Sequence, residues 1–271
     1  MAPALGGGSI PWSVLLAVAL GTLAVKTQAQ NVISWNVDDN GTISGANVAG
    51  VVPAANWNDS WLENGNAISP YGSPTAVNGL LDNSGTATSL NIAYQAWGFW
   101  SIQGSAPGQD ADSTYNRNLL NGYLNAGPAG WGPPVTNSTI ALSQIPYGQY
   151  NLYVYFSSDV AGRIGSISDV TTVYDFTSMG PAEISGANAL FTQTTDTLGN
   201  NPSADYAVFS GETANSLTVT CNALGGNDQW LGIAGFQIVA VPEPGVMALA
   251  GIGGLGLLLM GRRTRRSGCD R

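Results

Sequence analysis

The residues best suited to bind a ligand are tryptophans that stand among polar side chains or in glycine-rich segments. The four best placed are Trp57, Trp61, Trp131 and Trp230. An indole ring stacks on the C–H face of a sugar, while neighbouring amides and carboxylates bind the hydroxyl groups. Trp97 and Trp100 stand in a less polar segment, Trp-Gly-Phe-Trp, and are weaker candidates. The pattern favours glycan binding over the alternative that each tryptophan only packs in the core.

Acidic side chains at alternate positions suggest a second kind of site. Asp110 and Asp112 are separated by one alanine and followed by Ser-Thr, and the segment 38–41 reads Asp-Asp-Asn-Gly. Calcium takes six to eight oxygen ligands, so either cluster supplies about half a site. The alternative is that these carboxylates bond to the backbone of their own turns. Asp110 and Asp112 are therefore the candidate ligands of a structural calcium site.

Paired carboxylates would indicate a third chemistry, the hydrolysis of glycosidic bonds. Two carboxyl groups about 5 to 9 Å apart can do this without histidine. Glu183 lies in a segment rich in glycine and proline, and Glu212 lies in a predicted hairpin turn. Neither position points to a cleft, so a carboxylate-dependent, glycan-active enzyme is the minority interpretation.

Several other chemistries are excluded by residue type. The chain has no histidine, which removes the Ser-His-Asp triad and the usual zinc sites. Cys221 therefore lacks a base to activate it, and its place in an alternating segment predicts a small core side chain. No glycine-rich turn leads from a strand into a helix, as a phosphate-binding loop requires.

The net charge of residues 30–240 limits the kinds of molecule that they can bind. Residues 30–240 contain two basic residues, Arg117 and Arg163, against 15 Asp and Glu, which gives 2 − 15 = −13. Nucleic acid is excluded as a partner because phosphate binding needs a basic face. Such an acidic surface, rich in amides and hydroxyls, suits the extracellular medium and neutral glycans or cations.

The pattern along the chain is that of short strands between turn residues. The predicted strands are residues 32–37, 89–95, 138–145, 149–156, 171–176, 189–195, 206–210, 216–221 and 233–239. Residues 152–156 are apolar on both faces and should be central in a layered structure. Residues 118–124 allow a helix of one or two turns, and residues 104–134 are expected to form a long surface excursion. The sequence thus predicts an all-β, single β-sandwich of jelly-roll type.

One stretch adds a resemblance to this pattern. Residues 140–156 read IALSQIPYGQYNLYVYF and residues 232–239 read GIAGFQIV. This order is similar to galactose-binding-like and malectin-like β-sandwiches, in which a strand, a Pro-Xaa-Gly turn and a tyrosine-rich strand form the centre of one sheet. The resemblance implies the fold more than a ligand.

Both ends of the sequence indicate export. Residues 14–25 form an apolar run, and Thr-Gln-Ala at 27–29 supplies small residues for cleavage by signal peptidase. We expect residues 1–29 to be a signal peptide, although no basic residue precedes its apolar run.

The C-terminal segment has three parts. Val241, Pro242, Glu243 and Pro244 come first. An uncharged run then begins at Gly245 and ends at Met260, which as a helix would be about 24 Å long. The basic residues that follow are Arg262, Arg263, Arg265 and Arg266. Arginine stays on the cytoplasmic side, so we predict a short transmembrane helix at 245–260 with its N-terminal end outside and its C-terminal end inside.

This tail resembles the PEP-CTERM sorting signal of bacteria that have exosortases, over residues 241–266. The resemblance implies that an exosortase, a membrane-embedded transpeptidase, recognises the motif at 241–244 and removes the tail. The basic segment 261–271 is somewhat longer than usual. The implied destination is the cell surface or an extracellular matrix.

The sequence therefore predicts three parts: a signal peptide (1–29), an exported β domain (30–240) and a sorting signal (241–271). The expected role is non-catalytic contact with extracellular polysaccharide. Before it reaches its destination, the protein is expected to be anchored transiently in the membrane through the C-terminal helix. A purely structural or adhesive surface protein is the alternative, and a glycan-active enzyme is the second alternative.

Overall fold

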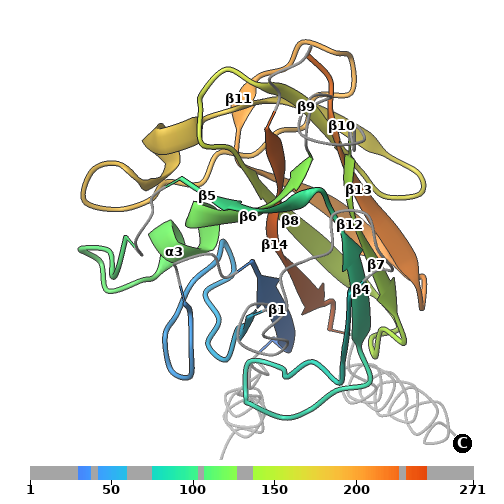
Figure 1. Ribbon diagram of the computed structural model, residues 1–271. Helices are drawn as coiled ribbons and strands as arrows, with labels where there is room; N and C mark the ends of the chain where they lie inside the picture. The colour runs from blue at the N-terminus through green and yellow to red at the C-terminus, as the bar shows by residue number, and fades with distance from the viewer. Residues whose placement is uncertain are drawn as a thin grey trace, which may run out of the picture.

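The fold consists of two β-sheets with few helical turns (Figure 1). The computed structural model describes residues 30–37, 42–59, 75–102, 107–126, 137–225 and 230–242. The expectation of a predominantly β domain with two sheets is confirmed.

The first sheet is built around its last strand. Its order is β12 (Tyr206–Glu212), β8 (Tyr150–Ser157), β14 (Leu231–Ala240), β1 (Val32–Asn36) and β2 (Asn58–Asp59), with β6 (Gly122–Ala126) also on β14 and β5 (Gly98–Ser101) on β6. One edge of β14 is shared, because β6 pairs with residues 231–233 and β1 with residues 235–239. The other edge pairs antiparallel with β8 over nearly its whole length. The prediction that residues 152–156 are central is confirmed.

The second sheet is a longer row of strands. Its order is β11 (Ser203–Ala204), β10 (Val173–Ser178), β9 (Ile164–Ser168), β13 (Leu217–Ala223), β7 (Asn137–Ser143), β4 (Asn91–Gln95) and β3 (Thr75–Asn78). All neighbours are antiparallel except β10 and β11. Buried and less buried residues alternate along β7, as expected for a sheet with one face on the core.

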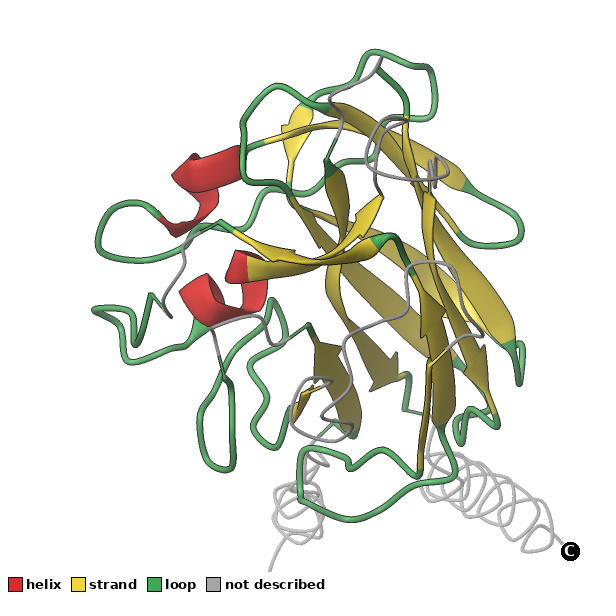
Figure 2. Cartoon of the chain, viewed as in Figure 1, coloured by secondary structure: helices red, strands yellow, loops and turns green. Residues whose placement is uncertain are grey.

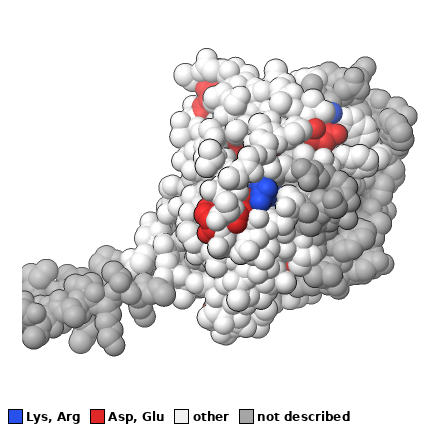
Figure 3. All heavy atoms as spheres, turned by 90° about the vertical axis from the view of Figure 1, so that its left-hand side faces the viewer, with Lys and Arg blue, Asp and Glu red and all other residues white. Residues whose placement is uncertain are grey.

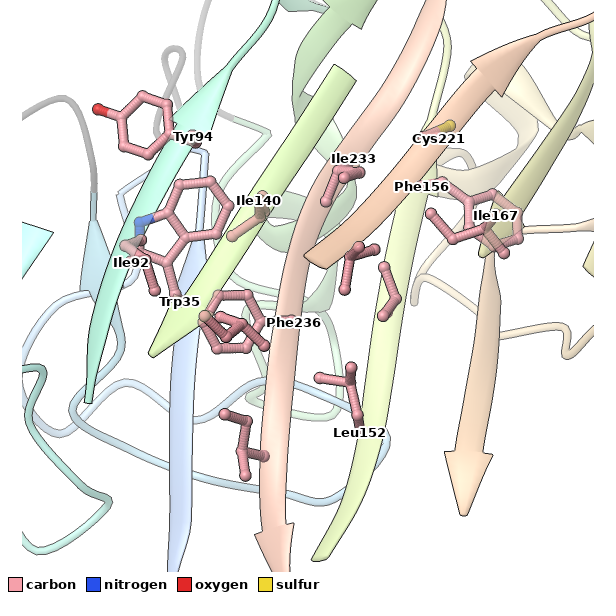
Figure 4. Close-up of a cluster of buried hydrophobic side chains, with 14 of the residues drawn as sticks. Trp35, Ile92, Tyr94, Ile140, Leu152, Phe156, Ile167, Cys221, Ile233 and Phe236 are labelled. Carbon is pink, nitrogen blue, oxygen red and sulfur yellow. The ribbon is translucent and has the colours of Figure 1, made fainter. Parts of the chain in front are cut away.

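The main core lies between the two sheets (Figure 4). Trp35 of β1 stacks on Phe236 of β14, with ring centroids 5.7 Å apart, and contacts Tyr94 of β4 in the other sheet at 5.5 Å. Phe156 of β8 likewise stacks on Phe176 of β10, at 3.7 Å. Cys221 is fully buried in this cluster, which confirms that it is a core side chain.

A second, smaller core covers the outer face of the first sheet. Two short helices, α3 (Asn116–Asn121) and η1 (Gly180–Ile184), lie on this side (Figure 2). The cluster includes Trp57, Leu119, Leu120, Tyr123 and Tyr155. Tyr155 belongs to it, whereas its neighbours Val154 and Phe156 belong to the main core, because side chains alternate along β8.

Two predictions about local structure are wrong. The excursion expected at 104–134 is not a surface loop over its described part, 107–126, since α3 and β6 bury Leu119, Leu120 and Leu124 completely. The strand expected at 189–195 is absent, and only an isolated bridge joins Gln193 to Tyr206. Each of the other eight predicted segments contains a strand, whereas β2, β3, β5, β6, β9 and β11 were not predicted.

Membrane crossing was expected only outside the described residues. Within them, no helix has the length and apolar character that a bilayer span requires. The predicted signal peptide and the run from Gly245 to Met260 lie outside the described residues.

Candidate functional site

An aromatic cleft of about 290 Å³ lies at one end of the two sheets. Its lining residues are Trp97, Trp100, Asp159, Arg163 and Trp230. This volume is close to the lower end of the range for small-molecule sites, about 300 Å³.

Strand ends and short connections place these five residues. Trp97 lies between β4 and β5 and donates its backbone N–H to Asn125 of β6 at 2.8 Å, while Trp100 is on β5 itself. Trp230 immediately precedes β14, and Asp159 and Arg163 lie in the connection from β8 to β9. The cleft thus forms where β8 ends and β14 begins.

The aromatic rings are held at an angle to one another. Trp97 and Trp230 pack edge to face, with ring centroids 5.0 Å apart and planes at 89°. Trp100, on the outer strand β5, is 50% exposed. Trp97 Nε1 is buried and has no hydrogen-bond acceptor among the described residues. The cleft therefore offers exposed indole surface, chiefly that of Trp100.

The polar part of the cleft is a network centred on Arg163. Its Nη1 forms an ion pair with Asp159 Oδ1 and donates to the carbonyl oxygen of Trp230 and, at 3.2 Å, to Ser158 Oγ. The Tyr123 hydroxyl also donates to Asp159 Oδ1, at 3.2 Å. Burial, and then the charge of Asp159, raises the pKa of Tyr123, which keeps it a donor. Arg163 thereby fixes the backbone of Trp230 relative to Asp159.

The four predicted glycan-binding tryptophans do not form one site. Trp230 lines the cleft. Trp57 is only 5% exposed, packs near Tyr155 in the outer core and donates its Nε1–H to the carbonyl of Ala54 at 2.9 Å. It has no open ring face for a sugar, so the assignment of Trp57 is corrected to core packing. Trp61 and Trp131 lie outside the described residues.

The predicted calcium ligands are engaged by the protein itself. Asp110 Oδ1 lies 2.8 Å from Arg117 Nε and accepts the N–H of Ala189 at 2.9 Å, while Oδ2 accepts the N–H of Arg117 at 3.1 Å. Asp112 is exposed and accepts both the hydroxyl (2.6 Å) and the N–H (3.0 Å) of Thr114, which lowers its pKa. Among the described residues, no three His, Cys, Asp or Glu side chains gather to hold a metal. Asp110 and Asp112 are accounted for as loop-stabilising residues.

Two carboxyl groups are fully buried away from the cleft. Glu183 Oε2 is 2.6 Å from Ser157 Oγ, whose single proton has a second acceptor, the carbonyl of Leu120, at 2.7 Å. Burial raises the pKa of Glu183 well above its ordinary value, and the charge of Asp205 raises it further. Burial also raises the pKa of Asp205 to about 7. A protonated Glu183 donating to Ser157 satisfies both contacts, and no substrate reaches either carboxyl group.

Part of the cleft was missed at the level of sequence. Trp97 and Trp100 looked like the weaker tryptophans, and Asp159 and Arg163 carried no local motif. One signal was present: Arg163 is one of two basic residues between positions 30 and 240, and a lone cation in so acidic a region suggests a specific role. Its partners, however, come from different strands.

The first and the last described residues lie side by side, at the other end of β14. Ala240 N–H donates to the carbonyl of Asn31 at 3.0 Å, and the Gln30 side chain donates to the carbonyl of Ala240 at 2.9 Å. Val241 N–H donates to the carbonyl of Gln149 at 3.0 Å, so the chain remains paired up to this residue. Val241 and Pro242 of the predicted motif are described, whereas Glu243, Pro244 and the basic residues beyond them are not.

Comparison with known proteins identifies the tail. A family described as the PEP-CTERM protein-sorting motif matches residues 240–266, which confirms the resemblance seen in the sequence. No curated protein matches the chain.

One solved structure that the chain matches is an Arthrobacter globiformis T6 isomalto-dextranase complexed with panose. The match has 10% identity and a TM-score of 0.26, and it covers 61% of this chain but only 23% of the other. At that TM-score the likeness carries no information on the ligand or the activity of this chain.

Proposed function

We propose, from the premise that this chain carries a PEP-CTERM sorting motif, that it is a surface or matrix protein which contacts extracellular polysaccharide without cleaving it. The motif indicates export and C-terminal membrane-anchored sorting toward the cell surface. Removal of the tail by an exosortase and cleavage by signal peptidase belong to the same proposal.

The aromatic cleft is the observation that carries the polysaccharide part. Three tryptophans and an Asp–Arg pair converge on one concave site. Indole faces stack on the C–H faces of sugars, and fixed polar groups beside them orient the hydroxyls. Residue types that bind sugars therefore meet in a cleft, although they are distant in sequence.

The non-catalytic part rests on where the carboxyl groups lie. Hydrolysis of a glycosidic bond by acid–base catalysis needs two carboxyl groups on either side of the bond. Among the described residues, Asp159 is the one acidic residue that lines the cleft, and it is ion-paired with Arg163. Glu183 and Asp205, whose charges interact, are both fully buried. The described part of the cleft has groups that can hold a sugar chain but no second carboxyl group to cut it.

The finer fold assignment belongs to this proposal as well. A jelly-roll of the galactose-binding-like class would place ligand contacts at one end of a rigid pair of sheets. The cleft formed by the ends of β8 and β14 agrees with that placement.

The proposal is tested by affinity electrophoresis of the full-length chain in detergent, through gels that contain soluble polysaccharides. Trp100→Ala removes the most exposed ring of the cleft, and we expect it to weaken binding at least tenfold, or about 1.4 kcal/mol. Leu198→Ala is the matched control, since Leu198 is 85% exposed and does not line the cleft. Equal retardation of Trp100→Ala and wild type would remove the cleft from the function. Release of reducing sugar by the wild type would overturn the non-catalytic assignment.

A further inference from the structure

We propose that the cleft selects uncharged sugar chains and rejects acidic ones. This inference rests on the proposed function and deepens it by naming the class of glycan. It depends on how the few charges of the exported domain are distributed.

Between positions 30 and 240, no unpaired cation is available for an acidic sugar. Binding of a uronate or a sulfate ester normally relies on arginine or lysine. Arg117 and Arg163 are the only basic residues between positions 30 and 240, and both are described. Arg117 pairs with Asp110 and donates to the carbonyl of Gln109 at 2.7 Å. Arg163 pairs with Asp159 inside the cleft. Figure 3 shows basic side chains (blue) next to acidic ones (red), on a face where most other residues are uncharged (white).

The remaining charge of the domain is repulsive to an anion. The side chain of Asp159 is 30% exposed at the cleft, whereas that of Arg163 is 12% exposed. The ion pair therefore presents an accessible carboxylate oxygen as a hydrogen-bond acceptor, while the guanidinium is largely buried. The surrounding domain, at −13, adds a negative field of longer range.

A cationic ligand is the other candidate for an aromatic cleft near a carboxylate. Quaternary ammonium groups bind between indole faces when an unpaired negative charge completes the site. Here Arg163 already neutralises Asp159, and its own positive charge lies beside the indoles that would receive the ligand. The cleft is therefore poorly suited to a cation.

Uncharged sugar hydroxyls fit the groups that are present. A hydroxyl both donates and accepts, so it can donate to the exposed carboxylate of Asp159. The C–H face of the same sugar can stack on the exposed ring of Trp100. Such binding forms no ion pair, so its affinity should depend little on salt.

The test compares neutral and acidic polysaccharides on the full-length chain. Neutral probes are mixed-linkage β-glucan, galactomannan and dextran, and acidic probes are alginate and hyaluronan. Each is measured at 50 and 500 mM NaCl, with wild type, Trp100→Ala and the control Leu198→Ala. Tetramethylammonium is added to a separate series as a competitor.

We expect at least one neutral probe to bind in a Trp100-dependent way, with less than a twofold change in Kd between the two salt concentrations. Asp159→Asn should increase the relative affinity for acidic probes. Trp100-dependent binding of acidic probes alone, or competition by tetramethylammonium at low millimolar concentration, would overturn this inference and leave the cleft as the binding site. Absence of Trp100-dependent binding to every probe would overturn the proposed function itself.

Discussion

Trp230 and Ala240 stand at opposite ends of the same strand, β14. Trp230 lines the cleft immediately before the strand begins, and Ala240 is its last residue, hydrogen-bonded to the first described residues, Gln30 and Asn31. Ten residues of extended chain separate the two ends by about 30 Å. In Figure 1, β14 runs through the middle of the sheet. The aromatic cleft and Val241, where the sorting motif begins, are therefore at opposite ends of the domain.

This separation predicts that anchoring does not block the cleft. The full-length chain in lipid nanodiscs should bind a soluble neutral glycan with the same Kd, within about twofold, before and after release at a protease site inserted behind Pro244. Isothermal titration calorimetry on both samples measures this. A tenfold gain in affinity on release would mean that the membrane covers the cleft.

The Arg163 network predicts a coupling between the two charges of the cleft. Arg163→Met leaves Asp159 without its ion pair and the Trp230 carbonyl without its donor. Because both side chains are partly exposed, we expect the free energy of unfolding to fall by about 1–3 kcal/mol. Asp159→Asn combined with Arg163→Met should recover part of the loss, as urea unfolding of all four proteins would reveal. Strict additivity of the single losses would show that the pair is not coupled.

The buried carboxyl of Asp205 predicts a stability that falls with rising pH. Its pKa is raised to about 7, so between about pH 4 and pH 7 the folded state holds a proton that the unfolded state has lost. The free energy of unfolding should decrease across this window and level off above it. Asp205→Asn keeps the acceptor for the Thr192 N–H, at 2.8 Å in the wild type, and should flatten the curve and stabilise the protein at pH 7.5.

Thermal unfolding from pH 4 to pH 8 measures the effect. Exposed Asp112→Asn is the control that should leave the slope unchanged. Glu183→Gln should remove a further part of the slope, because the pKa of Glu183 is raised as well. An unchanged slope in Asp205→Asn would show that Asp205 titrates normally in the fold.

Two glycines on neighbouring parts of the first sheet should differ sharply in how much stability their replacement by alanine costs. A Cβ on Gly232 of β14 would lie 1.5 Å from the backbone oxygen of Leu124, whereas a Cβ on Gly98 of β5 meets nothing within 4 Å. We expect Gly232→Ala to destabilise the fold by about 3 kcal/mol or more, because two paired strands must separate. Gly98→Ala should change stability by no more than about 0.5 kcal/mol. Circular dichroism and urea titration distinguish the two, and a folded, equally stable Gly232→Ala would contradict the close pairing of β14 and β6.

The sequence predicted the strands whose pattern is local. In β7, apolar and polar residues alternate because one face is buried, and in β8 apolar residues stand on both faces because both are largely buried. Either pattern can be recognised from successive residues alone. Short strands such as β5 and β6 gave no such signal, since β5 has only four residues and β6 is buried at every position. The segment 189–195 shows the converse: its pattern resembles a strand, but it has no continuous partner to pair with.

Trp57 and Trp230 show why the site was harder to predict than the strands. Both stand among amides and carboxylates, so the local sequence made them equally good candidates for sugar binding. Trp57 is buried under the outer core, while Trp230 lies at the open end where β14 begins. Burial depends on what packs above a residue, and that is set by segments far away in the chain.

The sequence by itself determined the sorting tail, the strongly acidic domain and the exclusion of histidine-based chemistry, because each depends only on which residues are present and in what order. The tertiary structure decided that residues near 97, 160 and 230 form one cleft, that Arg117 and Arg163 are ion-paired, and that Val241, where the sorting motif begins, lies at the opposite end of β14. Strand pairing decides these points, since hydrogen bonds between distant strands bring together side chains that no local pattern connects.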